Sequence, residues 1–512
     1  MKSSVLWRRG SVFVMGMVML LVSPIAHGLE LDPAERARSL ILEMRLQEAE
    51  RVLEGSGSDT RVVLVRGRML LYSTRYEEAQ GVLERSDVLA TEEGAHLAQV
   101  ARGSARAVAG AFVVHDLYRD VVVRLQDDRD QPLVPFIAEV VHASRVVMRQ
   151  ELGVDLPSPM RIELVRDHFS LAAMTGLPED AARTTGTVAV ANWGRVTMVT
   201  PRSMDSAYRW MDTLAHELAH VALGLGTRDR APLWLQEGVA KYFEKRWREW
   251  DSYDESPSAD AVAWAGFDMG LGRDFEGIGR SVALLPSPVE ATVVYAQVES
   301  FLGFLVRALG DRLLSEMVPR LREAWDGDGV SEVLESISGQ DLVAWQAVWR
   351  DWLESVPREG ASEVLLGAQA PDPVAMRDVR LGRLLLERGR GKAVMRLLES
   401  ARGYLPADLH VRYLLAKSYL LEGSEERAWS EVAVADPPMT PHAEAFSLRG
   451  RLLKNRGSGG DVEGEADAAL FRGLSMNPWS TEVACEGLDE PVLPSSPANS
   501  WLCRAARLHP RR

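Results

Sequence analysis

The sequence predicts a central α+β domain, residues 109–357, between two regions of α-helical repeats, residues 29–108 and 377–512. Runs of β-branched residues occupy the first half of the central part and helical patterns its second half, which is typical of an α+β domain. Both flanking regions repeat small residues at helical spacing. A chain of 512 residues also exceeds the roughly 250 to 300 residues that one hydrophobic core supports, so several domains are expected.

Residues 1–28, "MKSSVLWRRGSVFVMGMVMLLVSPIAHG", have the pattern of a signal peptide. Lys2, Arg8 and Arg9 precede an apolar run, residues 12–22, that is short for a bilayer span, and small residues follow it. We therefore expect an exported protein, periplasmic or secreted, with an uncleaved membrane anchor as the alternative. No later segment is expected to span a membrane.

Composition excludes one class of partner and indicates a C-terminal crosslink. The net charge is −14 and no Lys/Arg-rich block stands out, so a nucleic-acid partner is not expected, because phosphate binding requires a concentrated basic face. The only two cysteines, Cys485 and Cys503, lie near the C-terminus of a chain that we expect to be exported. They are predicted to form a disulfide that crosslinks the last secondary-structure elements of the chain, and two unpaired buried thiols are the alternative.

The N-terminal region, residues 29–108, repeats one pattern of small and bulky residues. The two copies are Ala37, Leu46, Ala49 and Leu53, and then Gly67, Tyr76, Ala79 and Leu83. Small residues where two helices touch resemble the tetratricopeptide repeat, and "LLYSTRYEEAQGVLER" is the clearest copy. One or two units are too few for a free-standing solenoid, so we expect this region to dock on its neighbour.

The C-terminal region, residues 377–512, contains three further stretches that each predict helix, turn and helix. They are "LGRLLLERGRGKAVMRLLES", "YLLAKSYLLEGSEERAWSEV" and "LRGRLLKNRGSGGDVEGEADAALFRGLSMNP", the third with a Gly-rich insertion at residues 457–460. Such helical pairs serve as scaffolds or as grooves for a protein partner, and the scaffold role is favoured here. The preceding stretch, residues 358–376, has the Gly/Ala/Pro character of a linker.

The central region combines strand and helix patterns in a definite order. Strands are expected within residues 118–128, at 160–165, and as a hairpin about Asn-Trp-Gly within 186–201. Helices are expected at 136–153, 212–225 and 231–247, and mainly helices are expected after residue 247. The helix 212–225 therefore directly follows the hairpin in sequence.

That helix, "DTLAHELAHVALGL", carries the clearest functional motif of the chain. His216 and His220 are four residues apart, so both imidazoles leave the same face of the helix and can reach one zinc ion. Glu217, one step round the helix, can take a proton from a water on that ion. The alternative is a core helix that carries H-E-x-x-H by chance, which is expected on the order of once in a hundred such chains.

A catalytic zinc usually has three protein ligands and an open position for water. Glu237, in "PLWLQEGVAKYF", is the candidate for the third ligand, because the 17 residues from His220 to Glu237 allow one helix to end and a second to return. A carboxylate in the first turn of a helix also suits the helix dipole without any metal. Following H-E-x-x-H at this interval, the ligand interpretation is favoured.

These two segments resemble the gluzincin branch of zinc metallopeptidases, and most closely its peptidase-MA-like group of exported bacterial proteins. The resemblance extends over residues 112–356 and implies a zincin-like metallopeptidase domain. It implies that His216, His220 and Glu237 bind one catalytic Zn²⁺ and that Glu217 is the general base. In related enzymes a tyrosine beyond the third ligand stabilises the oxyanion. The matching candidate here is Tyr295, in "VYAQVESFLGFLVRALGDRLL". The alternative is a tyrosine that only packs within its helix.

Two departures from related families bear on the activity. Zinc aminopeptidases of this kind hold the free amino group of the substrate with an acidic residue on the edge strand, and "GTVAVANWGRVTMV" contains no acid. The E-x-x-x-D pattern of thermolysin-like enzymes is also absent, because Lys241 stands four residues after Glu237. The sequence therefore predicts an exported zinc endopeptidase acting on a peptide or protein substrate. The alternative is a repeat-based binding or assembly factor of the cell envelope whose peptidase-like domain is inactive.

Overall fold

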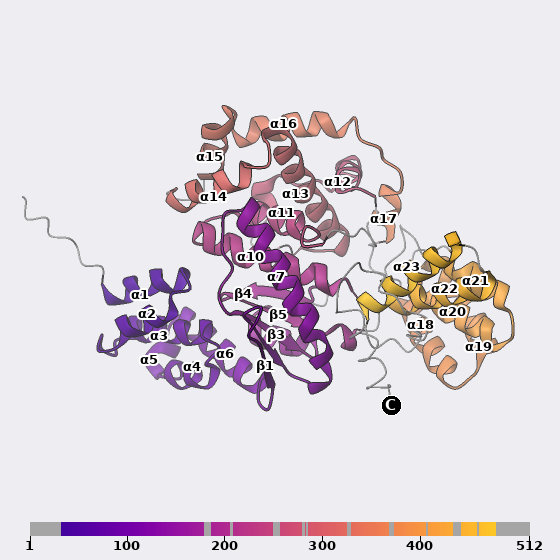
Figure 1. Cartoon of the computed structure of the whole chain (residues 1–512), viewed down its shortest axis with the longest axis horizontal. Helices are drawn as coiled ribbons and strands as arrows, with labels where there is room; N and C mark the ends of the chain where they lie inside the picture. The colour runs from indigo at the N-terminus through magenta and orange to yellow at the C-terminus, as the bar shows by residue number, and fades with distance from the viewer. Residues whose placement is uncertain are drawn as a thin grey trace, which may run out of the picture.

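A computed structural model describes residues 32–178, 186–204, 208–248, 257–278, 282, 285–324, 329–367, 373–405, 408–433, 442–457 and 460–477. The predicted signal peptide, residues 1–28, and the predicted disulfide between Cys485 and Cys503 lie outside these residues. A small sheet occupies the centre of the molecule, with the N-terminal helices on one side and the C-terminal helices on the other (Figure 1).

The N-terminal region consists of helices that follow the predicted pattern. Their bounds are α1 Pro33–Leu42, α2 Leu46–Leu53, α3 Thr60–Tyr72, α4 Tyr76–Leu83, α5 Ser86–Leu89 and α6 Glu92–Ala107. The predicted small residues Ala37, Ala49 and Ala79 are fully buried. At Gly67 helices α3 and α4 approach so closely that an added Cβ would lie 2.4 Å from the Leu83 side chain. The expected helical pairs are confirmed.

The sheet has five strands in the order β1-β2-β3-β5-β4. Their bounds are β1 Phe112–Asp116, β2 Val121–Leu125, β3 Met160–Val165, β4 Ala189–Asn192 and β5 Arg195–Val199. β2, β3 and β5 are parallel, whereas β1 and β4 pair antiparallel at the two edges. The predicted hairpin is confirmed, with Trp193 and Gly194 in its turn; β1 was not predicted.

The two faces of the sheet are covered by different parts of the chain. Alternate residues such as Val123, Ile162 and Met198 are buried in the core with α7 Val134–Glu151 and α10 Trp210–Thr227. The opposite face carries polar side chains that meet the N-terminal helices. There the Tyr76 hydroxyl donates to Glu163 Oε1 (2.7 Å), and Arg195 Nη1 donates to the Leu71 carbonyl (2.9 Å). The expectation that the N-terminal region docks on its neighbour is therefore confirmed.

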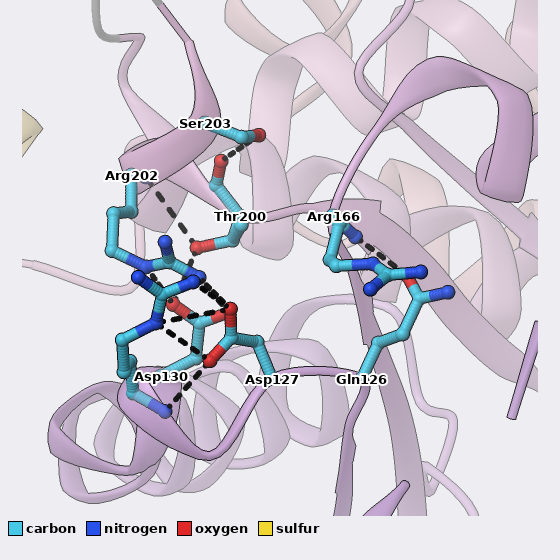
Figure 2. Close-up of polar contacts among 8 residues, drawn as sticks. Gln126, Asp127, Asp130, Arg166, Thr200, Arg202 and Ser203 are labelled. Carbon is cyan, nitrogen blue, oxygen red and sulfur yellow. Dashed lines mark hydrogen bonds and ion pairs between the residues drawn. The ribbon is translucent and has the colours of Figure 1, made fainter. Parts of the chain in front are cut away.

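An ionic cluster joins the segments that follow β2 and β5. Arg202 lies 2.8 Å from Asp127 Oδ2 and 2.9 Å from Asp130 Oδ1, and the Thr200 hydroxyl donates to the same Asp130 oxygen (3.0 Å), as Figure 2 shows. Asp130 is fully buried. Because a buried carboxylate is tolerated only when it is paired, this cluster holds Thr200 and Arg202, just after β5, against the segment that follows β2.

Helices dominate the rest of the central region, as predicted for its second half. Besides α7 and α10 they are α8 His168–Thr175, α11 Leu233–Phe243, α12 Ala259–Asp268, α13 Pro288–Leu309, α14 Leu313–Glu323, α15 Gly329–Ser338, α16 Leu342–Leu353 and α17 Ala361–Gly367. Contrary to the expectation from sequence, α13 is long and apolar enough to cross a membrane. However, 72% of its apolar stretch is buried inside the protein, as in a core helix.

Part of the segment predicted as a linker, residues 358–376, belongs to the packed structure instead. Helix α17 lies within this segment, and its apolar residues recur at helical spacing. Ala361 and Leu365 are therefore buried in the same core as the sheet and α10. The C-terminal helices are α18 Pro373–Glu387, α19 Gly391–Tyr404, α20 Leu409–Leu421, α21 Glu425–Val432, α22 Ala443–Arg456 and α23 Gly460–Met476. They form the three predicted helix-turn-helix pairs.

Candidate metal centre

Helix α10 packs against both strands of the β4–β5 hairpin and carries the predicted H-E-x-x-H motif. Its first turn is fixed by buried polar contacts from two distant parts of the chain. Asp212 pairs with Arg248 (2.9 Å), and Trp210 Nε1 donates to the Ser475 carbonyl of α23 (2.7 Å). The C-terminal repeats therefore contact the helix that presents His216, Glu217 and His220.

Helix α11 brings the predicted third ligand beside this motif. Trp234 and Leu235, in its first turn, are buried in the core. At Gly238 the helix lies against α13, where an added Cβ would be only 3.0 Å from the Val298 carbonyl oxygen. This close approach sets the position of the neighbouring Glu237, which is almost completely buried.

The three predicted ligand atoms form a small triangle. His216 Nε2 and His220 Nε2 lie 3.2 Å apart, and Glu237 Oε2 lies 3.5 Å from His216 Nε2 and 3.4 Å from His220 Nε2. Ligands at 2.0–2.1 Å around a tetrahedral zinc ion are separated by about 3.3 to 3.4 Å. Glu237 Oε2 is buried and makes no hydrogen bond to a described residue. A divalent cation would supply the partner that this oxygen lacks, so the residues present fit the metal.

A second carboxylate, which the sequence did not predict, faces the other ring nitrogen of His216. Glu244 Oε2 lies 3.4 Å from His216 Nδ1, and Lys241 Nζ lies 2.6 Å from the same oxygen. Carboxylates in this position fix the orientation and the tautomer of a metal-binding histidine. Glu244 follows Glu237 by seven residues, two helical turns, and this spacing was the only signal in the sequence. Lys241, which interrupts the thermolysin-like pattern, holds this carboxylate.

The charges around the histidines favour a cation between them. Burial lowers the pKa of His216, but contacts with Glu237 and Glu244 and the charge of Glu217 outweigh it and raise this pKa to about 10. Burial raises the pKa of Glu237, yet the charge of His220 and the contacts with both histidines hold it well below its usual range. The carboxylates therefore stabilise positive charge at the point where the three ligand atoms converge.

Glu217 and Tyr295 line a cavity of about 830 Å³ that opens beside the ligands. Burial raises the pKa of Glu217, and the charges of His220 and His216 oppose this effect. The Tyr295 ring centroid lies 6.3 Å from that of His216. Burial, together with the charges of Glu237, Glu217 and Glu244, raises the pKa of Tyr295 well above its usual value, so the phenol keeps its proton. Residues 186–189, at the start of β4, line the same cavity.

Substitution of Glu244 by Gln is expected to weaken zinc binding by about tenfold or more, because the charged acceptor that orients the His216 ring is replaced by a neutral and weaker one. Competition with a chromophoric zinc chelator measures this affinity directly. Glu354→Gln, an exposed change on the surface, serves as the control. Equal zinc affinity in the wild type, Glu244→Gln and Glu354→Gln would show that Glu244 does not position His216.

The structure brings together His216, Glu217, His220, Glu237 and Tyr295, which lie on three helices, α10, α11 and α13. It adds Lys241 and Glu244 to the residues that the sequence indicated. The site is thus assembled from segments far apart in the chain. Comparison of the chain with protein-family models, with curated proteins and with solved structures returned no match, so the functional argument comes from the sequence and the geometry of this site.

Proposed function

We propose that this protein is an exported zinc-dependent endopeptidase with a zincin-like central domain. The triangle of His216, His220 and Glu237 carries the proposal, because its 3.2–3.5 Å edges match the ligand spacing of a tetrahedral zinc site. The signal-peptide pattern of residues 1–28 supports export.

The reaction requires a metal-bound water and groups that move its proton. Zinc held by His216, His220 and Glu237 would lower the pKa of a bound water and polarise the scissile carbonyl. Glu217 accepts the proton of the attacking water and passes it to the leaving amine. Its burial favours this role, because burial raises the pKa of the Glu217 carboxyl and so makes it a stronger base. Tyr295 donates a hydrogen bond to the developing oxyanion.

The edge of the sheet supports an extended peptide as the substrate. Among the strands of the described residues, β4 pairs only with β5 and lies at an edge of the sheet, so its other side offers backbone groups to an extended chain. Residues 186–199 of this hairpin contain no acid to hold a terminal amino group. Cleavage within a chain, rather than removal of single N-terminal residues, is therefore proposed.

The full chain, purified from an export compartment under zinc-replete conditions, tests the proposal. We expect about one zinc per chain and internal cleavage of an unfolded protein, measured by mass spectrometry of the fragments. A chelator should stop the reaction and added zinc should restore it. A chain that binds one zinc and cleaves neither unfolded proteins nor peptide libraries would contradict the proposed activity.

A further inference from the structure

A second cavity, of about 270 Å³, lies at the His220 end of the metal centre. Helix α10 supplies part of its lining, including His220 and Gly224, and the β4–β5 turn supplies Trp193. The N-terminal helical region supplies the remaining wall through Leu42, at the end of α1, and Tyr72, at the end of α3. The wall thus comes from outside the α+β domain.

The α1–α2 turn is held firmly in this position. Gly194 of the β4–β5 turn is so close to Met44 that an added Cβ would lie 2.3 Å from the Met44 sulfur. Beside Met44, the Glu43 carboxylate pairs with Arg228, which follows α10, and with Arg322 of α14 (3.0 Å to Arg322). The N-terminal wall is therefore a fixed part of the cavity.

The two cavities lie one after the other along helix α10 and the β4–β5 hairpin, with the proposed zinc ligands between them. Residues 186–189 of the hairpin line the larger cavity and residues 191–194 line the smaller one. Along α10, His216 and Glu217 face the larger cavity, whereas His220 faces the smaller one. A peptide extended along β4 with its carbonyl at the ligands would place a neighbouring side chain in the smaller cavity.

Asp229 gives this cavity a negative charge. Its carboxylate lies close to Gly224, which stands one helical turn beyond His220. A Cβ added to Gly224 would be 2.7 Å from Asp229 Oδ1. Burial raises the pKa of the Tyr72 hydroxyl to about 12, and the charge of Asp229 contributes to this shift. Asp229 is the only Asp, Glu, Lys or Arg among the described lining residues. No described side chain forms an ion pair with it, and the nearby Arg68 is paired with Glu93 (2.6 Å).

We propose that this cavity is a substrate subsite for a Lys or Arg side chain next to the scissile bond, with Asp229 as its counter-charge and specificity-determining residue. The inference rests on the proposed peptidase function. Leu42, Trp193 and Leu225 offer apolar surface to the methylene groups of such a side chain, while its cationic end reaches Asp229. Asp229 is itself exposed, so an aliphatic side chain would gain no ion pair there and water would continue to solvate the carboxylate.

Paired peptides test the subsite. N-acetylated, internally quenched peptides carry Arg or its neutral isostere citrulline at each position next to the cleaved bond. For one of these positions we expect kcat/KM to be roughly fivefold higher with Arg, the size of effect that a partly exposed ion pair produces. Asp229→Asn should reduce the ratio to about one, and Asn tolerates the left-handed conformation of this residue (φ 58°). The exposed change Asp155→Asn is the matched control and should leave the ratio unchanged.

The outcomes separate this inference from the proposed activity. Cleavage by the wild type with equal kcat/KM for Arg and citrulline at every position would overturn the subsite and leave the peptidase standing. If no peptide is cleaved, fluorescence anisotropy of labelled peptides on the zinc-loaded full chain decides the question. Tighter binding of the Arg peptide that is lost in Asp229→Asn would support the subsite, and equal binding of both peptides would reject it.

Discussion

Glu217→Gln is expected to reduce the rate of peptide hydrolysis by roughly 10³-fold, within the 10² to 10⁴ range of general acid–base catalysis, while zinc remains bound. The amide has nearly the same shape as the carboxylate but cannot accept the proton of the attacking water. Because Glu217 is not one of the three ligands, the zinc content should stay at about one per chain. Hydrolysis of a quenched peptide and metal analysis of the same preparation measure both quantities.

The exposed substitution Glu335→Gln on α15 provides the control, since it makes the same chemical change at a residue that does not line the cavity. In cells, Glu217→Gln also separates the peptidase from the alternative of a repeat-based assembly factor. If the variant keeps the biological role of the protein intact, the endopeptidase proposal fails, and the helical repeats become the place to look for function.

His216→Ala and Glu237→Ala are expected to reduce bound zinc from about one per chain to nearly none. Each change removes one of three protein ligands, and two ligands do not hold zinc at ordinary concentrations. Loss of zinc should also lower stability, because a ligand present at a thousand times its Kd contributes about 4 kcal/mol to the free energy of unfolding. Thermal unfolding with and without chelator measures this contribution.

Chelator should therefore lower the Tm of the wild type and leave the Tm of both variants unchanged. His142→Ala, at an exposed position on α7, is the control and should behave as the wild type does. A His216→Ala protein that still binds one zinc per chain would show that the metal is held elsewhere, and the triangle of ligand atoms would lose its proposed role.

Local patterns in the sequence predicted most of the secondary structure. The pattern of residues 160–165 identified β3, and two β-branched runs about Asn-Trp-Gly identified the β4–β5 hairpin. The spacing of small residues identified the helical pairs. The sequence missed β1, in which Phe112 and Val113 are exposed, so the strand lacks the alternation that marks a half-buried one. It also assigned α17 to a linker, because the composition of residues 358–376 outweighed the short helical pattern within it.

For the candidate site, the sequence by itself determined which side chains can share one metal. The four-residue spacing of His216 and His220 fixes them on one face of a helix, whatever that helix packs against. Only the tertiary structure decided that Glu244 faces His216 and that Asp229 lies in a cavity walled by the α1–α2 turn. Contacts between distant segments depend on how helices and sheet pack, and no local periodicity encodes that packing.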